Sequence, residues 1–98
     1  MGEFTAALRL PVIVGEDGVT YTAVRQPCLN EGLVLMEAAE GAKNGESGLM
    51  PILRASKTML LAIGFPDEVV GALPAWKVMD YARDFFTESC IAPKPQAE

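Results

Sequence analysis

The sequence contains no histidine and only two cysteines among its 98 residues, which excludes most kinds of catalytic and metal-binding site. Without an imidazole there is no Ser-His-Asp or Cys-His catalytic arrangement and no histidine metal ligand. Cys28 and Cys90 are too far apart for a CxxC redox pair or a local zinc knuckle. We therefore predict no catalytic, cofactor-binding or metal-binding residues. We interpret both cysteines as small apolar filler kept reduced in a cytosol; a disulfide between them stays open, but nothing in the sequence favours one.

Positive charge is also scarce, with eight Lys and Arg against thirteen Asp and Glu and a net charge of −5. The cations are scattered along the chain, whereas nucleic-acid binding takes most of its affinity from clustered Lys and Arg that neutralise phosphates. The same argument disfavours anionic membrane surfaces. Apolar runs such as residues 59–63 are far too short to span a bilayer, and residues 1–4 carry no basic start of a secretory signal. We expect an intracellular protein that binds neither nucleic acid nor membrane.

The composition is that of a folded protein, because half of the residues are hydrophobic and 21% are charged. The length allows one small domain with little room for a second. We predict a single domain over residues 1–91, followed by a flexible, proline-containing tail over residues 92–98.

Residues 4–25 predict a β-hairpin. A β-branched, apolar run ends at Val14, the Gly-Glu-Asp-Gly sequence of residues 15–18 is a strong turn signal, and residues 19–24 alternate between apolar and polar. A hairpin of two strands is barely stable by itself in water. One face of it should therefore pack on helices or on another chain.

Three to four short helices are predicted over about residues 30–88, which makes the expected fold class α+β. Helical spacing and cap signals place them at residues 30–43, 49–63, 65–74 and 75–88. Asn30 is the expected N-cap of the first helix, and Pro51 belongs in the first turn of the second.

The first predicted helix is apolar over more than one face. Leu29, Leu33 and Met36 share one stripe, while Leu35 and several alanines extend the apolar surface around the side. The chain also has five methionines, which are flexible and suit an adaptable interaction surface. An apolar patch left over after folding would mark a protein partner.

A cluster of aromatic and aliphatic residues surrounds Trp76. Such clusters in small proteins usually belong to the core, and the alternative is a contact surface for a partner. The candidate protein-binding residues are Phe65, Val69, Leu73, Trp76, Phe85 and Phe86.

Other motifs fail their tests. The glycine-rich residues 41–48 lack the spacing and the Lys-Ser/Thr ending of a phosphate-binding loop. Neither Ser47 nor Ser56 stands in the Asp-Ser-Leu pattern of phosphopantetheine carriers. Asp80 and Asp84 lie one helical turn apart among basic residues, so we interpret them as a solvated face rather than an acid–base pair.

The order of elements resembles the small tail assembly chaperones of tailed bacteriophages, over about residues 8–88. The shared pattern is a Val-x-x-x-Gly-x-x-Tyr hairpin, an Arg-x-Pro entry to the first helix, a Gly-hydrophobic-Pro-x-Glu-Val element before a Leu-Pro, and an aromatic-rich last helix. The corresponding residues are Asp17-Gly18, Arg25-Gln26-Pro27, Gly64-Phe65-Pro66-Asp67-Glu68-Val69, Leu73-Pro74 and Asp84-Phe85-Phe86.

The resemblance implies a non-enzymatic, self-associating chaperone in the cytoplasm of the infected host bacterium, absent from the finished virion. It implies binding to the tape-measure protein and recruitment of tail-tube subunits. Two other functions stay open at this point. One is a structural tail or head–tail connector component, and the other is a small helical regulatory protein that binds DNA through residues 47–88.

Overall fold

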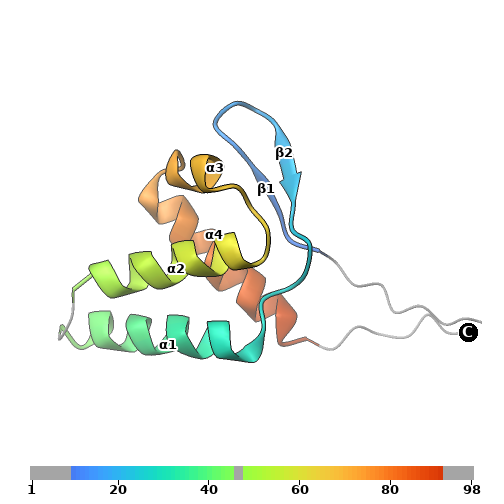
Figure 1. Cartoon of the computed structure of the whole chain (residues 1–98). Helices are drawn as coiled ribbons and strands as arrows, with labels where there is room; N and C mark the ends of the chain where they lie inside the picture. The colour runs from blue at the N-terminus through green and yellow to red at the C-terminus, as the bar shows by residue number, and fades with distance from the viewer. Residues whose placement is uncertain (1–9, 46–47, 92–98) are drawn as a thin grey trace, which may run out of the picture.

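The computed structural model describes residues 10–45 and 48–91, and in this part of the chain an antiparallel hairpin is followed by four helices (Figure 1). The elements are β1 (Val12–Val14), β2 (Thr20–Thr22), α1 (Leu29–Lys43), α2 (Met50–Ala62), α3 (Asp67–Gly71) and α4 (Ala75–Ser89). The predicted α+β class is confirmed. The first part of the predicted hairpin, residues 4–9, and the predicted tail, residues 92–98, lie outside the described residues.

The hairpin packs one face on the helices. Ile13 lies opposite Tyr21 in the antiparallel register; Ile13 is fully buried and Tyr21 packs against the core. The turn is held by the Asp17 carboxylate, which accepts hydrogen bonds from the Val19 N–H at 3.0 Å and the Tyr21 hydroxyl at 2.9 Å. Gly18, with a φ of 81°, supplies the left-handed turn conformation.

α2 is the central helix of the structure. In Figure 1, α1 and α2 lie antiparallel and side by side, and α4 runs across them behind α2. α2 contacts α1, α3 and α4. The first hydrophobic cluster joins the hairpin to α2, α3 and α4, and its buried members are Ile13, Ala23, Leu60, Ile63, Phe65, Val70, Leu73 and Val78. The second joins α1, α2 and α4 through Leu35, Ala55, Met59 and Ala82.

The start of α1 differs from the prediction. The N-cap is Cys28, two residues before Asn30, and the Glu31 carboxylate accepts a hydrogen bond from the Cys28 backbone N–H at 2.9 Å. Asparagine is a good N-cap by preference, but Glu31 stands three residues after Cys28, which is the spacing of a capping box. The prediction of Asn30 as the cap was therefore wrong. Pro51 does lie in the first turn of α2.

The interpretation of the cysteines as filler is also wrong. Cys28 and Cys90 are exposed and free, and each lies at a helix boundary rather than in a cluster. Ser56, in contrast, is fully buried and donates its hydroxyl to the Ile52 carbonyl at 2.7 Å. The Ser56 hydroxyl is thus satisfied inside α2 and is not accessible to a modifying enzyme.

A glycine brings α1 close to α4. Gly32 is buried, and a Cβ added to it would overlap the Phe86 ring, well inside the 3.0 Å that real Cβ contacts respect. Ala38 of α1 and Phe86 of α4 both pack against the second hydrophobic cluster. Close approach therefore depends on the small residues of α1, which turn toward the other helices.

Candidate protein-interaction surface

One stripe of α1 presents large apolar side chains to solvent. Leu29 is 67% exposed, Leu33 54% and Met36 40%. These residues are four and three positions apart, so they lie along one line of the helix. The opposite face of α1, which carries Gly32 and Leu35, is the one that packs on α2 and α4. The sequence predicted this stripe but gave no reason to prefer it as the exposed face.

A shallow groove connects this stripe with Trp76 of α4. The groove has a volume of about 240 Å³, and Met36 and Trp76 both line it. Its other lining residues are Leu35, Ala39, Ile52, Met79, Asp80 and Arg83. The Trp76 side chain is 60% exposed. We call Leu29, Leu33, Met36 and Trp76 together the α1–Trp76 surface.

Charged side chains border the groove beside Trp76. Arg83 forms an ion pair with Asp80 at 3.0 Å and with Asp84 at 3.6 Å. All three side chains are about half exposed or more, which confirms the solvated face predicted for the two carboxylates. An apolar centre with a polar border is the usual anatomy of a protein interface.

The six candidate binding residues divide between the core and the surface. Phe65 and Leu73 are 3% and 6% exposed and belong to the first hydrophobic cluster, so a partner does not reach them in this conformation. Val69, Phe85 and Phe86 are partly buried against the two clusters. Trp76 alone among the six is largely exposed.

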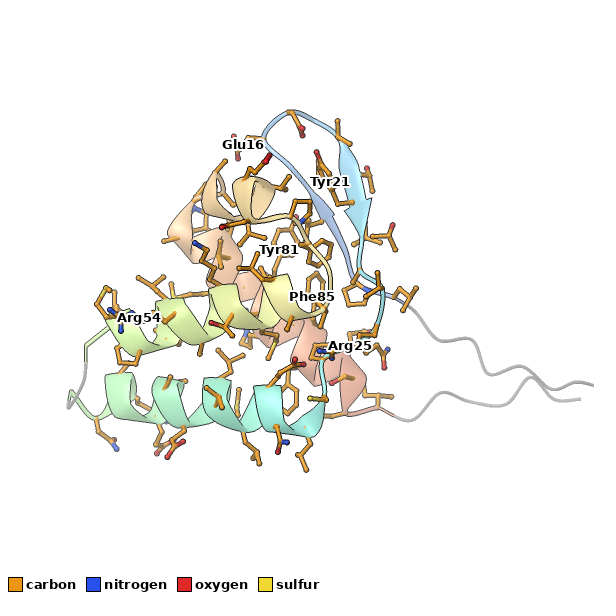
Figure 2. All side chains as sticks on the ribbon, in the orientation of Figure 1. Glu16, Tyr21, Arg25, Arg54, Tyr81 and Phe85 are labelled. Carbon is orange, nitrogen blue, oxygen red and sulfur yellow. The ribbon has the colours of Figure 1, made fainter. Side chains whose placement is uncertain are left out.

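The aromatic residues are buried because they fill the space between the hairpin and α4. Phe85 packs on Phe65 with ring centres 6.1 Å apart and stacks on Tyr81 at 5.4 Å. Figure 2 shows Tyr21, Tyr81 and Phe85 one after another between the hairpin and the helices. The aromatic cluster could be identified from the sequence. Its burial could not be predicted, because it depends on where the hairpin packs on the helices.

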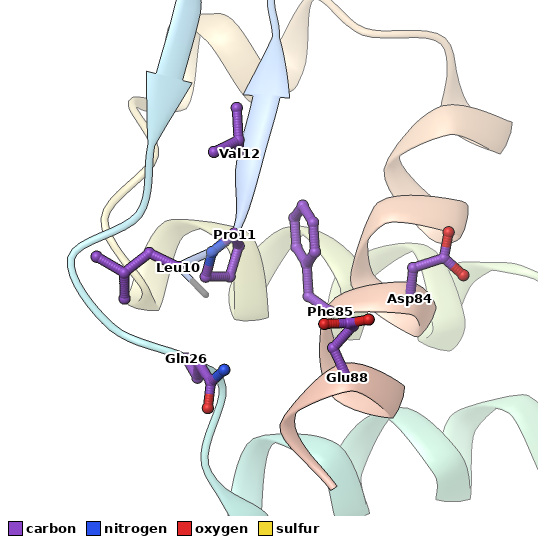
Figure 3. Close-up of a pocket in the computed structure, with 7 residues that line it drawn as sticks. All are labelled: Leu10, Pro11, Val12, Gln26, Asp84, Phe85 and Glu88. Carbon is purple, nitrogen blue, oxygen red and sulfur yellow. The ribbon is translucent and has the colours of Figure 1, made fainter. Parts of the chain in front are cut away.

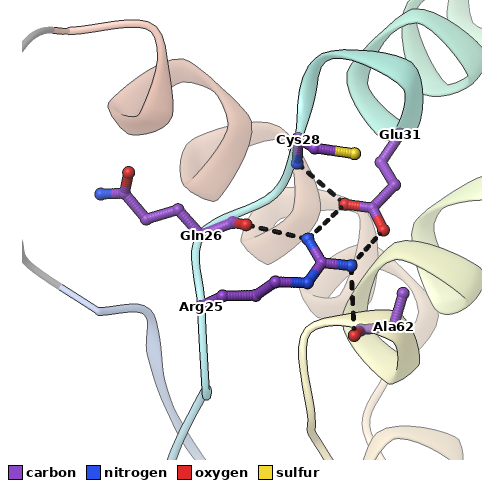
Figure 4. A network of polar contacts seen from close by, with 5 residues as sticks. All are labelled: Arg25, Gln26, Cys28, Glu31 and Ala62. Atoms are coloured by element: carbon purple, nitrogen blue, oxygen red, sulfur yellow. Dashed lines mark hydrogen bonds and ion pairs between the residues drawn. The ribbon is translucent and has the colours of Figure 1, made fainter.

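A polar clamp fixes the start of α1 (Figure 4). Arg25 donates to both carboxylate oxygens of Glu31, at 3.0 Å and 2.6 Å, and also to the Ala62 carbonyl at the end of α2, at 3.3 Å. The hydrogen bonds from Arg25, together with the Cys28 N–H, lower the pKa of Glu31 from 4.5 to about 2. The chain leaving the hairpin, the start of α1 and the end of α2 are thus fastened together. The clamp contributes to the orientation in which α1 presents its exposed stripe.

No group of three or more His, Cys, Asp or Glu side chains that could hold a metal ion occurs in residues 10–45 and 48–91. None of the helices that the structure describes is long and apolar enough to cross a membrane.

No protein-family model matches the chain, and neither a curated protein nor a solved structure matches it significantly. The resemblance to tail assembly chaperones therefore stays a prediction.

Proposed function

We propose that this protein is a non-enzymatic assembly chaperone for phage tails, which binds the tape-measure protein and helps to recruit tail-tube subunits. The observation that carries the proposal is the α1–Trp76 surface, where four large apolar side chains stay exposed in a small folded chain. Exposed apolar patches of this kind mark sites of protein interaction. The order of sequence elements supports the choice of client.

The proposed mechanism is temporary cover of an apolar client. An amphipathic helix of the tape-measure protein lays its apolar face along Leu29, Leu33 and Met36, as helices do in hydrophobic grooves. Trp76 supplies a rigid, amphipathic anchor at the end of this surface, and Met36 adapts its shape to different client side chains. The net charge of −5 keeps the chaperone and its client dispersed in the host cytoplasm.

Self-association belongs to the same proposal. A second copy covers the α1–Trp76 surface when no client is present, because an apolar stripe is complementary to another copy of itself in a two-fold arrangement. Client binding then replaces contacts between copies.

A pull-down from cells that co-express the tagged protein and its neighbouring genes tests the proposal. The wild type should recover a very long helical polypeptide together with a tube subunit. Leu33→Ser and Trp76→Ala should each reduce recovery at least about fivefold, as expected for central apolar anchors. Val19→Ser is the matched control, since Val19 is similarly exposed, at 49%, but lies on the hairpin.

Three results would contradict the proposal. Recovery that is equal in the wild type and in Leu33→Ser would exclude the α1–Trp76 surface as the client site. Purified particles that retain the protein would indicate a structural tail or connector component, and salt-dependent binding to DNA duplex would indicate a regulator.

A further inference from the structure

The free edge of β1 presents unpaired backbone groups toward α4. Residue pairs in an antiparallel ladder alternate between hydrogen-bonded and non-hydrogen-bonded. The Ala23 N–H donates to the Pro11 carbonyl at 2.8 Å and the Gly15 N–H donates to the Val19 carbonyl at 2.9 Å, which fixes the alternation. The backbone groups of Val12 therefore point away from β2.

The position of Tyr81 confirms this direction. Val14 lies two residues beyond Val12 and has the same orientation, and its N–H donates to the Tyr81 hydroxyl on α4 at 3.4 Å. The N–H and C=O of Val12 have no hydrogen-bond partner within residues 10–45 and 48–91. An edge strand in this state is a template for another strand.

A groove lies between this edge and α4 (Figure 3). It has a volume of about 470 Å³, which is within the usual range for binding pockets. The start of the hairpin provides Leu10, Pro11 and Val12, α4 provides Asp84, Phe85 and Glu88, and Gln26 completes the lining. β2 lies on the far side of β1 from the groove, so nothing from β2 covers the edge.

The two sides of the groove require different chemistry from an occupant. Asp84 and Glu88 are one turn apart on α4, and both residues line the groove. Within residues 10–45 and 48–91, no Lys or Arg lines the groove, although Arg83 approaches Asp84 from α4 itself at 3.6 Å. Phe85 and Val12 supply apolar contacts between the carboxylates and the strand edge.

We propose that the groove between β1 and α4 binds an extended, basic segment of a partner polypeptide, which adds a strand to the free edge of β1. The main chain of the segment pairs with the N–H and C=O of Val12, as in other cases of strand addition. Alternate side chains of the segment reach Phe85 or place Lys and Arg beside Asp84 and Glu88. This site is separate from the α1–Trp76 surface and does not depend on the function proposed above.

Fluorescence polarisation with the full chain tests the proposal directly. The probe is a labelled peptide of alternating Lys and Val, and its controls are the same peptide with Glu in place of Lys and one with N-methylated backbone amides. Only the unmodified Lys peptide should bind, and binding should weaken as salt is raised. Equal binding of all three peptides, or none of the Lys peptide, would overturn the proposal.

Variants separate the backbone contribution from the charge contribution. Val12→Pro removes the outward N–H and leaves the ladder to β2 intact, since proline is accepted where the strand N–H faces outward. Thr22→Pro is the matched control, because Thr22 lies opposite Val12 and points to the other edge of the hairpin. Val12→Pro should weaken binding about fivefold, the effect of one lost hydrogen bond, and Thr22→Pro should not weaken it.

The combined variant Asp84→Asn with Glu88→Gln should also weaken binding about fivefold at low salt and remove most of its salt dependence. Asp67→Asn with Glu68→Gln changes the same charge on α3 and should leave binding unchanged. If Val12→Pro disturbs folding, as seen by circular dichroism, the N-methylated peptide decides the backbone role. Strong protection of the Val12 amide from hydrogen exchange in the free protein would overturn the proposal, since the edge would already be covered.

Discussion

Replacing Gly32 by alanine should destabilise the protein, against the normal effect of this change in a helix. In an open helix, Gly→Ala stabilises by about 1 kcal/mol. At Gly32 the new Cβ overlaps three atoms of the Phe86 ring, so the ring or the whole of α1 must move. Overpacking of this kind costs about 1–3 kcal/mol, and Phe86 packs against the second hydrophobic cluster, which limits its movement.

Because the overlap involves three ring atoms, the cost should lie in the upper part of this range, about 2–3 kcal/mol. After the gain of about 1 kcal/mol in helix propensity, we expect a net loss of about 1–2 kcal/mol in the free energy of unfolding. For a domain of this size the melting temperature should fall by about 4–16 °C. Thermal and urea denaturation followed by circular dichroism measure both quantities. Gly71→Ala is the matched control, because the nearest atom to its added Cβ, an Asp67 carboxylate oxygen, is 3.9 Å away. That variant should gain about 0.5 kcal/mol.

A double-mutant cycle assigns the loss to the Phe86 ring. In a Phe86→Leu background the smaller side chain leaves room for the Cβ, so the cost of Gly32→Ala should shrink by about 1 kcal/mol. Stabilisation by Gly32→Ala, or the same cost in both backgrounds, would refute the close approach of α1 and α4.

Three further predictions concern other parts of the molecule. Glu31→Gln should cost about 1 kcal/mol at neutral pH, because it removes the charge from a pair whose Arg25 side chain is 43% exposed and so partly screened. The folded pKa of Glu31 is about 2 against 4.5 in the unfolded chain, so this contribution is complete above about pH 5 and disappears as the pH falls toward 2. Urea titrations should therefore give free energies of unfolding for the wild type and Glu31→Gln that converge at the acid end of this range. A difference that stays constant with pH would contradict the ion pair between Arg25 and Glu31. Trp76→Ala should lower the free energy of unfolding by less than about 1 kcal/mol, since the side chain is 60% exposed, and a larger loss would place Trp76 in the core. Ser56→Ala should leave the thermal midpoint unchanged or slightly raised, because the hydroxyl only adds a second hydrogen bond to the Ile52 carbonyl within α2; a clear fall would show that Ser56 contributes to stability.

Helix positions could be predicted from the sequence because local signals fix them. Pro51 marks the first turn of α2, Gly64 follows the end of that helix, and a proline stands on each side of α3. These signals are local and need no knowledge of the tertiary structure. The start of α1 was missed, because the Glu31 carboxylate is shared between the Cys28 N–H and Arg25, and Arg25 also bonds to the distant α2. The statistical preference for asparagine as an N-cap takes no account of a contact between residues that are distant in the sequence, such as that of Arg25 with α2.

The choice of buried face could not be predicted for α1. When a helix is apolar over most of its circumference, hydrophobic spacing does not distinguish inside from outside. The buried face of α1 is the one that carries Gly32, because the absence of a side chain there permits the contact with Phe86. Leu29 and Leu33 lie outside this contact. The same limit explains why Phe65 and Leu73 were grouped with Trp76 although they lie in the core.

The alternation of side chains along α2 has a consequence for how the protein unfolds. Met59 and Leu60 are neighbours in sequence, yet Met59 belongs to the cluster with α1 and Leu60 to the cluster with the hairpin. Loss of α2 therefore dissolves both clusters at once, so the two halves of the molecule cannot melt as separate cooperative units. The amides of α2 should be the slowest to exchange with solvent, because both clusters depend on this helix.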